Sequence, residues 1–280
     1  MAYQYVAVEK DGPITTITLN RPEVMNALHS DAHFELAEVF DAFAADESQW
    51  VGIVTGAGER AFSAGNDLKH QAGGGKMGSP PSGFAGLTSR FDLTKPLIAA
   101  VNGVAMGGGF EIALACDLII ASESAIFALP EPRVGLAALA GGLHRLPRAI
   151  GLKRAMGMIL TGRRVSAREG LELGFVNEVT APGELMAAAK RWAGLIGECS
   201  PMSIRASKQA VLKGLDELTL EAAIVGQNRY PAVAAMFRSA DFVEGPRAFS
   251  KGSSPSGFHC MCCMVLRCRS SSTRRPSSAI

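Results

Sequence analysis

The sequence predicts an α/β fold in which strands and helices alternate first and helices dominate later. Two observations lead to this prediction. Short runs of β-branched and other apolar residues recur as far as Ala128, most of them followed by Gly, Pro or Asn. From Gly142 onward the pattern is mostly helical. Alternating strands and helices are typical of an α/β core, and the length of 280 residues suits one large domain, or one domain with an appended piece.

The first strand is expected at 14–19, where β-branched residues end at the stop signal Asn20-Arg21-Pro22. A helix is expected near Ser30, because Leu36, Phe40 and Phe43 then fall on one face. The other expected strands are the apolar runs 51–55, 97–101, 118–121, 126–128 and 175–179.

Two further segments are expected between these strands. Residues 72–83 are rich in Gly, Ser and Pro, which predicts a flexible loop. A glycine-rich turn precedes an apolar stretch, which predicts a helix over 109–116.

Composition excludes several classes of protein. Hydrophobic residues make up 48% of the chain and charged residues 19%, which is a globular composition. No apolar run reaches about 18 residues, so no membrane span is expected. The N-terminus lacks the basic and apolar regions of a signal or transit peptide. The first 250 residues hold only Cys116 and Cys199, which fits a reducing compartment, and we expect a cytoplasmic protein.

Residues 251–280 differ from the rest of the chain. They hold five basic residues, four cysteines and eight serines but no acid. The remaining residues have a slight excess of acid, so they lack the basic surplus of a nucleic-acid-binding protein. We expect this tail to be disordered. A metal site is the alternative, because His259, Cys260, Cys262 and Cys263 cluster, but a second ligand pair at a usual zinc spacing is missing.

Two glycine-containing patterns are rejected as functional motifs. Gly56-x-Gly58 follows a strand, but the turn does not open a helix and lacks the acid about 20 residues on that a dinucleotide site requires. Ser63 lies in a pattern one residue short of a nucleophile elbow and does not follow a strand directly. A small residue in a tight loop is the preferred interpretation of Ser63.

The loop Ala64–Leu68 and the triplet Gly107–Gly109 are candidate ligand-binding segments. Small residues let a ligand approach main-chain N–H groups closely. The triplet precedes a helical stretch, where free N–H groups and the helix dipole favour an anion or a developing oxyanion. Tight backbone packing is the alternative explanation for both segments.

Two carboxylates occur in apolar surroundings. Glu111 lies in GGGFEIALAC and Glu131 lies between two prolines in IFALPEPRVGL. Burial would raise the pKa of each carboxyl toward the range useful for proton transfer. An exposed or salt-bridged glutamate is the alternative for either one alone, but two such acids beside two candidate N–H donor loops favour an acid/base site.

Taken together, these segments resemble the enoyl-CoA hydratase/isomerase (crotonase) family. Within it, GFAGLT, GGGFE, FALPE and VEGPRAF look most like carnitinyl-CoA dehydratases, which are also crotonobetainyl-CoA hydratases. The matching segments cover most of residues 12–250 in family order: LNRPEVMNAL (19–28), GIVTGAGERAFSAGNDLK (52–69), KPLIAAVNGVAMGGGFEIALACDLIIA (95–121), FALPEPRVGL (127–136), GGLHRLPRAIG (141–151) and LTGRRVSAREGLELGFVNEV (160–179).

The resemblance implies a fold and an assembly. The implied fold is a crotonase-like spiral of ββα turns over residues 1–195, followed over 196–250 by a C-terminal helical region used for trimerisation. Residues 251–280 form an atypical Ser/Cys/Arg-rich tail beyond it. The implied assembly is a homotrimer or a dimer of trimers, with an acyl-CoA substrate and with neither nucleic acid nor membrane as a partner.

The resemblance also implies roles for residues. Ala64 and Gly108 match the positions whose N–H groups form the oxyanion hole for the thioester carbonyl. Glu111 and Glu131 match the two catalytic carboxylates of hydratases. The residues that line the CoA or substrate are then Val24, Ala64, Gly65, Asn66, Asp67, Leu68 and Gly108.

The implied chemistry is the reversible addition of water to a 2-enoyl-CoA. Glu111 would activate the water that attacks C3, Glu131 would deliver the proton to C2, and the two N–H groups would stabilise the enolate-like charge. Neither a metal nor a separate cofactor is expected, because coenzyme A is part of the substrate.

The sequence departs from the family in two places. Residues 135–140 replace a segment that commonly contains proline and often a polar residue, and this wall is expected to face the acyl group. After Phe249 the family character ends abruptly, which resembles a frameshifted end. The alternatives left open are a Δ3,Δ2-enoyl-CoA isomerase, which can manage with one acid, and a nucleic-acid-binding member of the same fold.

Overall fold

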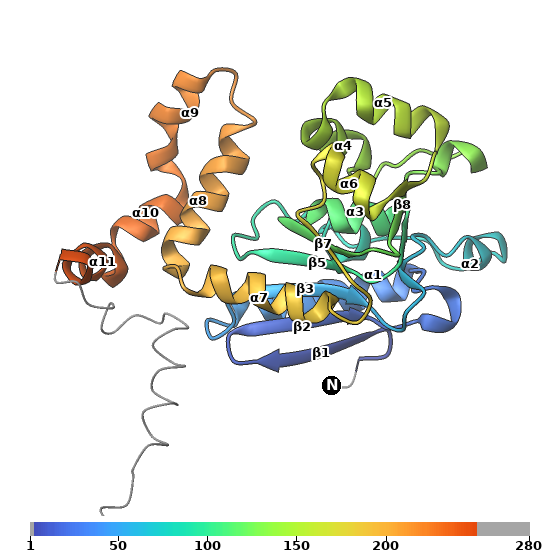
Figure 1. The fold of residues 1–280 in the computed structure, drawn as a ribbon, viewed down its shortest axis with the longest axis horizontal. Helices are drawn as coiled ribbons and strands as arrows, with labels where there is room; N and C mark the ends of the chain where they lie inside the picture. Colours follow the sequence, from blue (N-terminus) through green and yellow to red (C-terminus); the bar gives the residue numbers. More distant parts are fainter. Residues whose placement is uncertain (1–2, 251–280) are drawn as a thin grey trace, which may run out of the picture. The chain divides into compact units, whose positions relative to one another are not determined.

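The computed structural model describes residues 3–250 and divides the chain into two compact units (Figure 1). Of the described residues, the first unit comprises 3–93 and 97–193, and the second comprises 94–96 and 194–250. The predicted boundary between 195 and 196 lies two residues from this division. The predicted tail, including the possible metal cluster at 259–263, falls outside the described residues.

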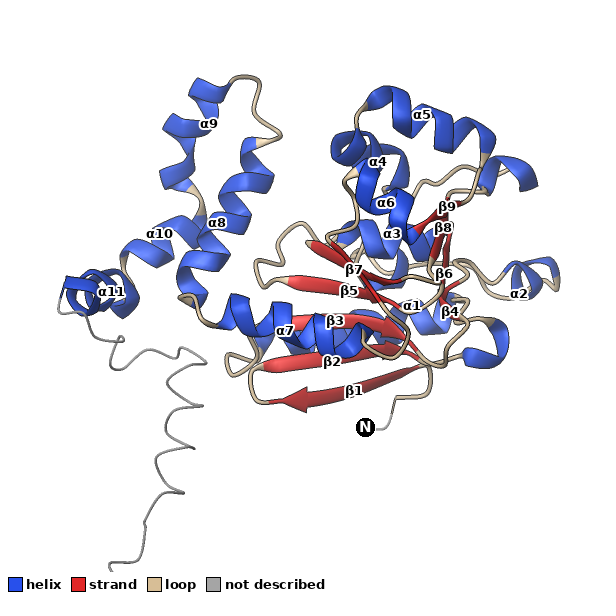
Figure 2. Cartoon of the chain, viewed as in Figure 1, coloured by secondary structure: helices blue, strands red, loops and turns tan. Residues whose placement is uncertain are grey.

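The first unit is built from a repeated strand–strand–helix arrangement (Figure 2). Three times in succession, one strand joins a six-stranded sheet and the next strand joins a smaller four-stranded sheet. The strand order is β1-β2-β3-β5-β7-β10 in the larger sheet and β4-β6-β8-β9 in the smaller one. Within each pair, β3–β4, β5–β6 and β7–β8, the chain passes from the larger sheet to the smaller one. This arrangement confirms the predicted α/β class and the ββα repeat.

The strands of this unit are β1 (Val6–Asp11), β2 (Ile14–Leu19), β3 (Val51–Gly56), β4 (Ala61–Ser63), β5 (Leu97–Val101), β6 (Val104–Met106), β7 (Leu118–Ser122), β8 (Ile126–Ala128), β9 (Val165–Ser166) and β10 (Glu178–Thr180). The helices are α1 (Ser30–Ala45), α2 (Leu68–Ala72), α3 (Gly108–Ala115), α4 (Gly142–Ile150), α5 (Leu152–Thr161), α6 (Ala167–Leu173) and α7 (Leu185–Gly197), the last of which crosses the division. Short 3-10 turns are η1 (Pro22–Val24), η2 (Phe84–Gly86) and η3 (Glu131–Val134).

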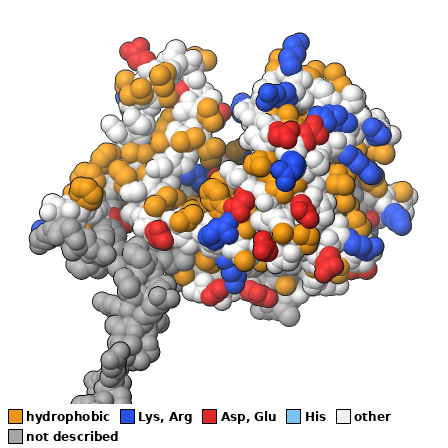
Figure 3. Space-filling model, in the orientation of Figure 1, with side chains coloured by type: hydrophobic (Ala, Val, Ile, Leu, Met, Phe, Trp, Pro, Cys, Tyr) orange, Lys and Arg blue, Asp and Glu red, His pale blue; other side chains and the backbone are white. Residues whose placement is uncertain are grey.

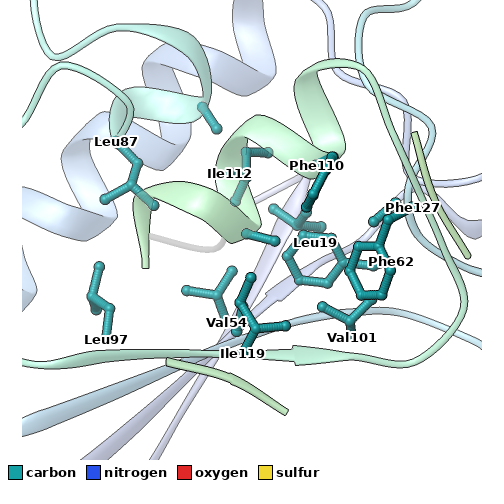
Figure 4. Packing of buried hydrophobic residues seen from close by; sticks show 14 of the residues in the cluster. Leu19, Val54, Phe62, Leu87, Leu97, Val101, Phe110, Ile112, Ile119 and Phe127 are labelled. Atoms are coloured by element: carbon teal, nitrogen blue, oxygen red, sulfur yellow. The ribbon is translucent and has the colours of Figure 1, made fainter. Parts of the chain in front are cut away.

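The core of the first unit lies between the sheets and the helix α3 (Figure 4). Phe110 on α3 packs against Phe127 on β8, with ring centroids 5.2 Å apart. Phe175 contacts both rings. Complete burial of such a side chain contributes about 1.5–3 kcal/mol. This packing fixes α3, whose first turn carries the predicted oxyanion glycine and Glu111.

One predicted strand is misplaced. Residues 175–179 were expected to be extended, but β10 begins only at Glu178. Helix α6 ends at Leu173 and is followed by Gly174, which has a left-handed backbone. The N–H groups of Phe175 and Val176 both donate to the carbonyl of Gly170. The apolar pair therefore closes a helix C-terminus and packs into the core rather than extending a strand.

The second unit is helical. Its helices after the end of α7 are α8 (Pro201–Gly214), α9 (Leu220–Gly226), α10 (Pro231–Phe237) and α11 (Ala240–Ser250), with the 3-10 turn η4 (Gln227–Arg229) between α9 and α10. Figure 3 shows hydrophobic side chains gathered on the surface of these helices. Leu218, in the turn between α8 and α9, is 99% exposed. Within residues 3–250, no helix combines the length and the apolar character that a membrane crossing needs.

Candidate active site

The first turn of α3 presents an unengaged backbone donor. Gly107 precedes the helix with a positive φ of 53° and donates its own N–H to the carbonyl of Ala128 on β8. Gly108 is the first helical residue, where no partner exists one turn back along the helix. Among the hydrogen bonds of residues 3–250, none uses the Gly108 N–H. The positive end of the helix dipole adds to its preference for a negatively charged oxygen.

The loop that was predicted to supply the second donor lies against this helix start. A Cβ added to Gly65 would stand 2.8 Å from the Gly108 nitrogen and 2.6 Å from the Met106 carbonyl oxygen. Gly65 also has a positive φ of 86°. Both facts require glycine at this position, and they place the loop directly beside the Gly108 N–H.

The prediction for Ala64 is wrong in its detail. The Ala64 N–H donates to the carbonyl of Met25 at 2.9 Å, and the Gly65 N–H donates to the hydroxyl of Ser63 at 3.1 Å. Neither is available to a ligand. The next N–H along the chain, that of Asn66, makes no hydrogen bond within the described residues. Sequence reasoning missed Asn66 as a donor because the pairing of the loop with the segment around Met25 is a tertiary contact.

The rest of this loop is held by the segment that begins at Val24. Leu28 donates to the Gly65 carbonyl at 2.8 Å and accepts from the Asp67 N–H at 2.9 Å, forming a parallel bridge with Asn66. Asp67 caps α2 and accepts from the Arg21 guanidinium at 3.0 Å, and both side chains are largely buried. The structure therefore brings the Val24 segment together with the predicted CoA-lining loop. Leu68, at the start of α2, is exposed.

Ser63 has a structural role, as the sequence interpretation preferred. Its hydroxyl is completely buried and donates to the carbonyl of Asn26 at 2.8 Å. Asn26 in turn donates through its amide to the carbonyls of Ala57 and Ala61. Among the described residues, the hydroxyl hydrogen-bonds only to backbone groups, so it lacks there the histidine and acid partners of a nucleophile.

Glu111, in the first turn of α3, is buried against the start of α4. Its carboxylate accepts the N–H of Gly142, the first residue of α4, at 2.8 Å. Burial, together with the negative charge of Glu131, raises the pKa of Glu111 to about 7. Backbone hydrogen bonds from Gly142 and Ala140 and the positive charge of Arg145 act in the opposite direction. A carboxyl with such a pKa exchanges protons readily near neutral pH.

Glu131, at the start of η3, lies on the other side of the helix start. A Cβ added to Gly107 would stand 2.7 Å from Glu131 Oε1, so the carboxyl rests against the glycine that precedes Gly108. Its Oε2 is buried and has no hydrogen-bond partner within the described residues. Burial raises the pKa of Glu131 above its usual value. A buried carboxyl oxygen without a hydrogen-bond partner is rare, and a catalytic role is one of the recognised explanations for such an atom.

The two acids and the two free N–H groups thus converge on the N-terminus of α3. Glu131 rests against Gly107, whose carbonyl accepts the N–H of Glu111 at 3.0 Å, and the charge of Glu131 raises the pKa of Glu111. This arrangement provides one base, one acid and donors for a negatively charged oxygen. Within residues 3–250, no group of three or more metal-ligating side chains gathers in one place.

Comparison with known proteins identifies the family. The chain matches the family described as enoyl-CoA hydratase/isomerase over residues 9–256. It is 43% identical to a carnitinyl-CoA dehydratase of Salmonella arizonae over 253 residues, which covers 88% of this chain and 95% of the relative.

Solved structures give the same result for the fold. An enoyl-CoA hydratase from Mycobacterium tuberculosis H37Rv superposes with a TM-score of 0.83 at 37% identity, covering 90% of this chain and 97% of that one. A carnitinyl-CoA dehydratase from Mycobacterium avium 104 superposes with a TM-score of 0.73 at 38% identity, covering 88% and 97%. The chain therefore belongs to the enoyl-CoA hydratase/isomerase family.

Proposed function

We propose that this protein is a hydro-lyase that adds water reversibly to the double bond of a 2-enoyl-CoA thioester. The observation that carries the proposal is the pair of acids, buried Glu111 and half-buried Glu131, at a helix start that presents the free N–H of Gly108. Similarity to carnitinyl-CoA dehydratases and enoyl-CoA hydratases supports the same reaction.

The oxyanion donors in this proposal are the N–H groups of Gly108 and Asn66. Attack on C3 of a conjugated thioester moves negative charge onto the carbonyl oxygen, giving an enolate-like species. The dipole of α3 strengthens the Gly108 N–H as a donor to negative charge. Asn66 follows Gly65, which lies so close to this group that a Cβ on it would stand 2.8 Å from the Gly108 nitrogen. Loss of one donor of this kind typically costs about 3–4 kcal/mol in the barrier.

The two glutamates move the protons. Ionised Glu111 accepts a proton from water while the water oxygen forms a bond to C3. Protonated Glu131 gives its proton to C2, and the carbonyl is restored as the enolate collapses. Both acids change protonation state in each turnover, so protons must exchange between them or with water before the next. The pKa of about 7 at Glu111 suits this exchange near neutral pH, and burial also raises the pKa of Glu131.

The other parts of the proposal follow from the family. The similarity to carnitinyl-CoA dehydratases supports a crotonobetainyl-CoA or carnitinyl-CoA substrate. Coenzyme A enters as part of the substrate, and the steps above involve no separate cofactor. The helical second unit is proposed to mediate assembly into a trimer or a dimer of trimers.

Substitution of the two acids tests the proposal. Glu111→Gln and Glu131→Gln keep the shape of each side chain and should each lower kcat for crotonyl-CoA and crotonobetainyl-CoA hydration by about 10²–10⁴. Glu123→Gln, at an exposed glutamate, is the matched control and should leave kcat unchanged.

Two results would contradict the proposal. One is either active-site variant hydrating both thioesters as fast as the parent protein. The other is a parent protein that moves the double bond of a 3-enoyl-CoA but hydrates no 2-enoyl-CoA, which would identify it as an isomerase.

A further inference from the structure

One aromatic side chain lies beside the candidate site without a role in the proposed chemistry. Phe84, in the turn η2, points the far edge of its ring at the oxyanion glycine: a Cβ added to Gly108 would stand 2.5 Å from Phe84 Cζ and 2.6 Å from Cε1. The Gly108 N–H is where the thioester carbonyl binds in the proposed function. Any acyl group bound there must therefore pass close to this ring.

The backbone around Phe84 is strained and is held in place by its surroundings. Ala85 has a φ of 54°, which is uncommon for a residue with a side chain, and it is almost fully buried. Gly86 has a φ of 62°, and a Cβ added there would lie 2.4 Å from the backbone of Ala37 on α1. Strain of this kind persists only where the surrounding structure enforces it, and it is concentrated at functional sites.

A buried histidine supplies part of that enforcement. His33 on α1 accepts the Ala85 N–H through Nδ1 at 3.1 Å, and its ring lies 4.3 Å from the Phe84 ring between centroids. Burial, reinforced by the charge of His29, lowers the pKa of His33 to about 4. The imidazole is therefore neutral at physiological pH, which it must be for Nδ1 to accept a hydrogen bond.

The same segment also reaches the Glu111 side of the site. The carbonyl of Thr88 accepts a hydrogen bond from the Arg145 guanidinium at 2.8 Å. Arg145 is the cation whose charge acts on the pKa of Glu111. Because Glu111 faces C3 in the proposed reaction, the segment from Phe84 to Thr88 borders the acyl side of the thioester.

We propose that Phe84 is a specificity-determining residue that restricts the site to short acyl groups, and that His33 is a positioning residue that holds its ring against Gly108. The inference rests on the proposed function for the direction in which the acyl group lies. It narrows the substrate class to short-chain 2-enoyl-CoA thioesters.

Binding of unreactive thioesters tests this directly. The dissociation constants of butyryl-CoA and octanoyl-CoA, measured by calorimetry, give a selectivity ratio that does not depend on catalysis. The parent protein should favour butyryl-CoA, and Phe84→Ala should shift the ratio toward octanoyl-CoA by about tenfold or more, within the range known for hydrophobic pockets. Phe34→Ala, at a 45% exposed phenylalanine beside His33 on α1, is the matched control and should not shift it.

The role of His33 is tested by two variants that differ in one acceptor. His33→Asn can place its amide oxygen where Nδ1 accepts from Ala85, so it should keep the parent ratio. His33→Leu has no acceptor and should shift the ratio in the same direction as Phe84→Ala. Circular dichroism of each variant checks that the fold is retained, and Phe84→Leu provides a smaller change of the ring if Phe84→Ala unfolds.

The outcomes separate this inference from the proposed function. An unchanged ratio in folded Phe84→Ala or Phe84→Leu overturns the specificity role, whatever the activity of the protein. A parent protein that binds both thioesters with the expected ratio but hydrates no enoyl-CoA overturns the proposed function alone. A parent that binds neither thioester overturns both.

Discussion

Glu111 and Glu131 are held differently, although burial raises the pKa of both. Glu111 accepts a hydrogen bond from the first N–H of α4, so its ionised form has a partner. Glu131 has a buried oxygen with none. A hydrogen bond to the ionised form lowers the pKa of a carboxyl, whereas burial raises it. Burial outweighs this bond at Glu111, because its pKa still rises to about 7, and the bond also keeps the ionised carboxylate in place to act as the base.

These pKa directions predict the pH dependence of hydration. Glu111 must be ionised to act as the base, so kcat/KM should be lost at low pH, where both carboxyls are protonated. Glu131 must be protonated to act as the acid, so kcat/KM should also be lost at high pH, where both carboxyls are ionised. The two carboxyls interact, and the limbs of this bell-shaped profile therefore report the pair.

Initial rates with crotonyl-CoA between pH 5 and 10 measure the profile. Glu111→Gln should remove the rising limb from the residual activity, and Glu131→Gln should remove the falling limb. A flat profile for the parent protein would be inconsistent with acid/base chemistry at these residues.

Among the elements, the start of α3 is the place where three successive positions require glycine. Gly107 has a backbone conformation suited to glycine, Gly108 contacts the Phe84 ring, and a Cβ on Gly109 would lie 2.1 Å from the Ser63 carbonyl oxygen. The three successive glycines therefore serve three different purposes. Together they allow the helix to begin with its N–H groups open beside a second backbone segment.

Substitution of Gly108 separates its N–H from its small size. Proline is well tolerated at the first helical position, so Gly108→Pro removes the donor while keeping the helix. Gly108→Ala adds a Cβ at the same place but retains the N–H. We expect Gly108→Pro to lose at least about 10² in kcat relative to Gly108→Ala. The carbonyl stretch of a bound thioester, which hydrogen bonding lowers, should shift to higher frequency only in the proline variant.

Helix α4 contributes a cation to the site through Arg145. This guanidinium donates a hydrogen bond to the Thr88 carbonyl and lies 5.9 Å from the centroid of the Phe91 ring. It also packs against Gly141, where an added Cβ would stand 2.1 Å from Arg145 Nη1. Its charge lowers the pKa of Glu111. Arg145 therefore links the segment from Phe84 to Thr88 to the turn at Gly141 and Gly142, where the Gly142 N–H donates to Glu111.

Removal of this charge should move the pH profile. In Arg145→Met the pKa of Glu111 should rise, so the rising limb of kcat/KM should move to higher pH and activity at pH 7 should fall. Arg148→Met is the matched control on the same helix, because Arg148 is exposed and donates only to the His144 carbonyl. An identical profile in Arg145→Met and Arg148→Met would show that Arg145 has no electrostatic influence on the base.

For the whole molecule, the sequence predicted the fold class and most elements because local patterns specify them. The strand at 14–19, the helix from Ser30 and the acids of the site all follow from short apolar or glycine-rich patterns. Two predictions, the Ala64 donor and the strand at 175–179, failed because tertiary contacts decide them. The Ala64 N–H donates to the Met25 carbonyl, and the Phe175 N–H donates to the Gly170 carbonyl at the C-terminus of α6. Neither contact can be inferred from the neighbouring residues in the sequence.

Phe84 and His33 were missed for the same reason. They lie about 50 residues apart in the sequence and belong to a loop end and a helix. An aromatic residue in a loop and a histidine on an apolar helix face are ordinary when considered separately. Only the fold shows that one positions the other beside Gly108.

The second unit carries a prediction about assembly. Leu215, Leu218 and Leu220 surround the turn between α8 and α9 and are 66%, 99% and 76% exposed. Leucines so exposed on one short segment are typical of an interface, and burial of each would contribute about 1.5–3 kcal/mol. We therefore expect the parent protein to sediment as a trimer or a hexamer, held in part by this segment.

Replacement of all three leucines by serine should shift the protein toward the monomer at micromolar concentration, measured by sedimentation equilibrium. Leu139→Ser and Leu160→Ser in the first unit change leucines that are 80% and 68% exposed, and they are the matched controls. Glu111, Glu131, Gly108 and Asn66 all lie in the first unit, so the triple substitution changes none of the groups in the proposed chemistry. A triple variant that still sediments as the parent does would show that this segment is not an interface. Dissociation caused by the controls instead would place the interface on the first unit.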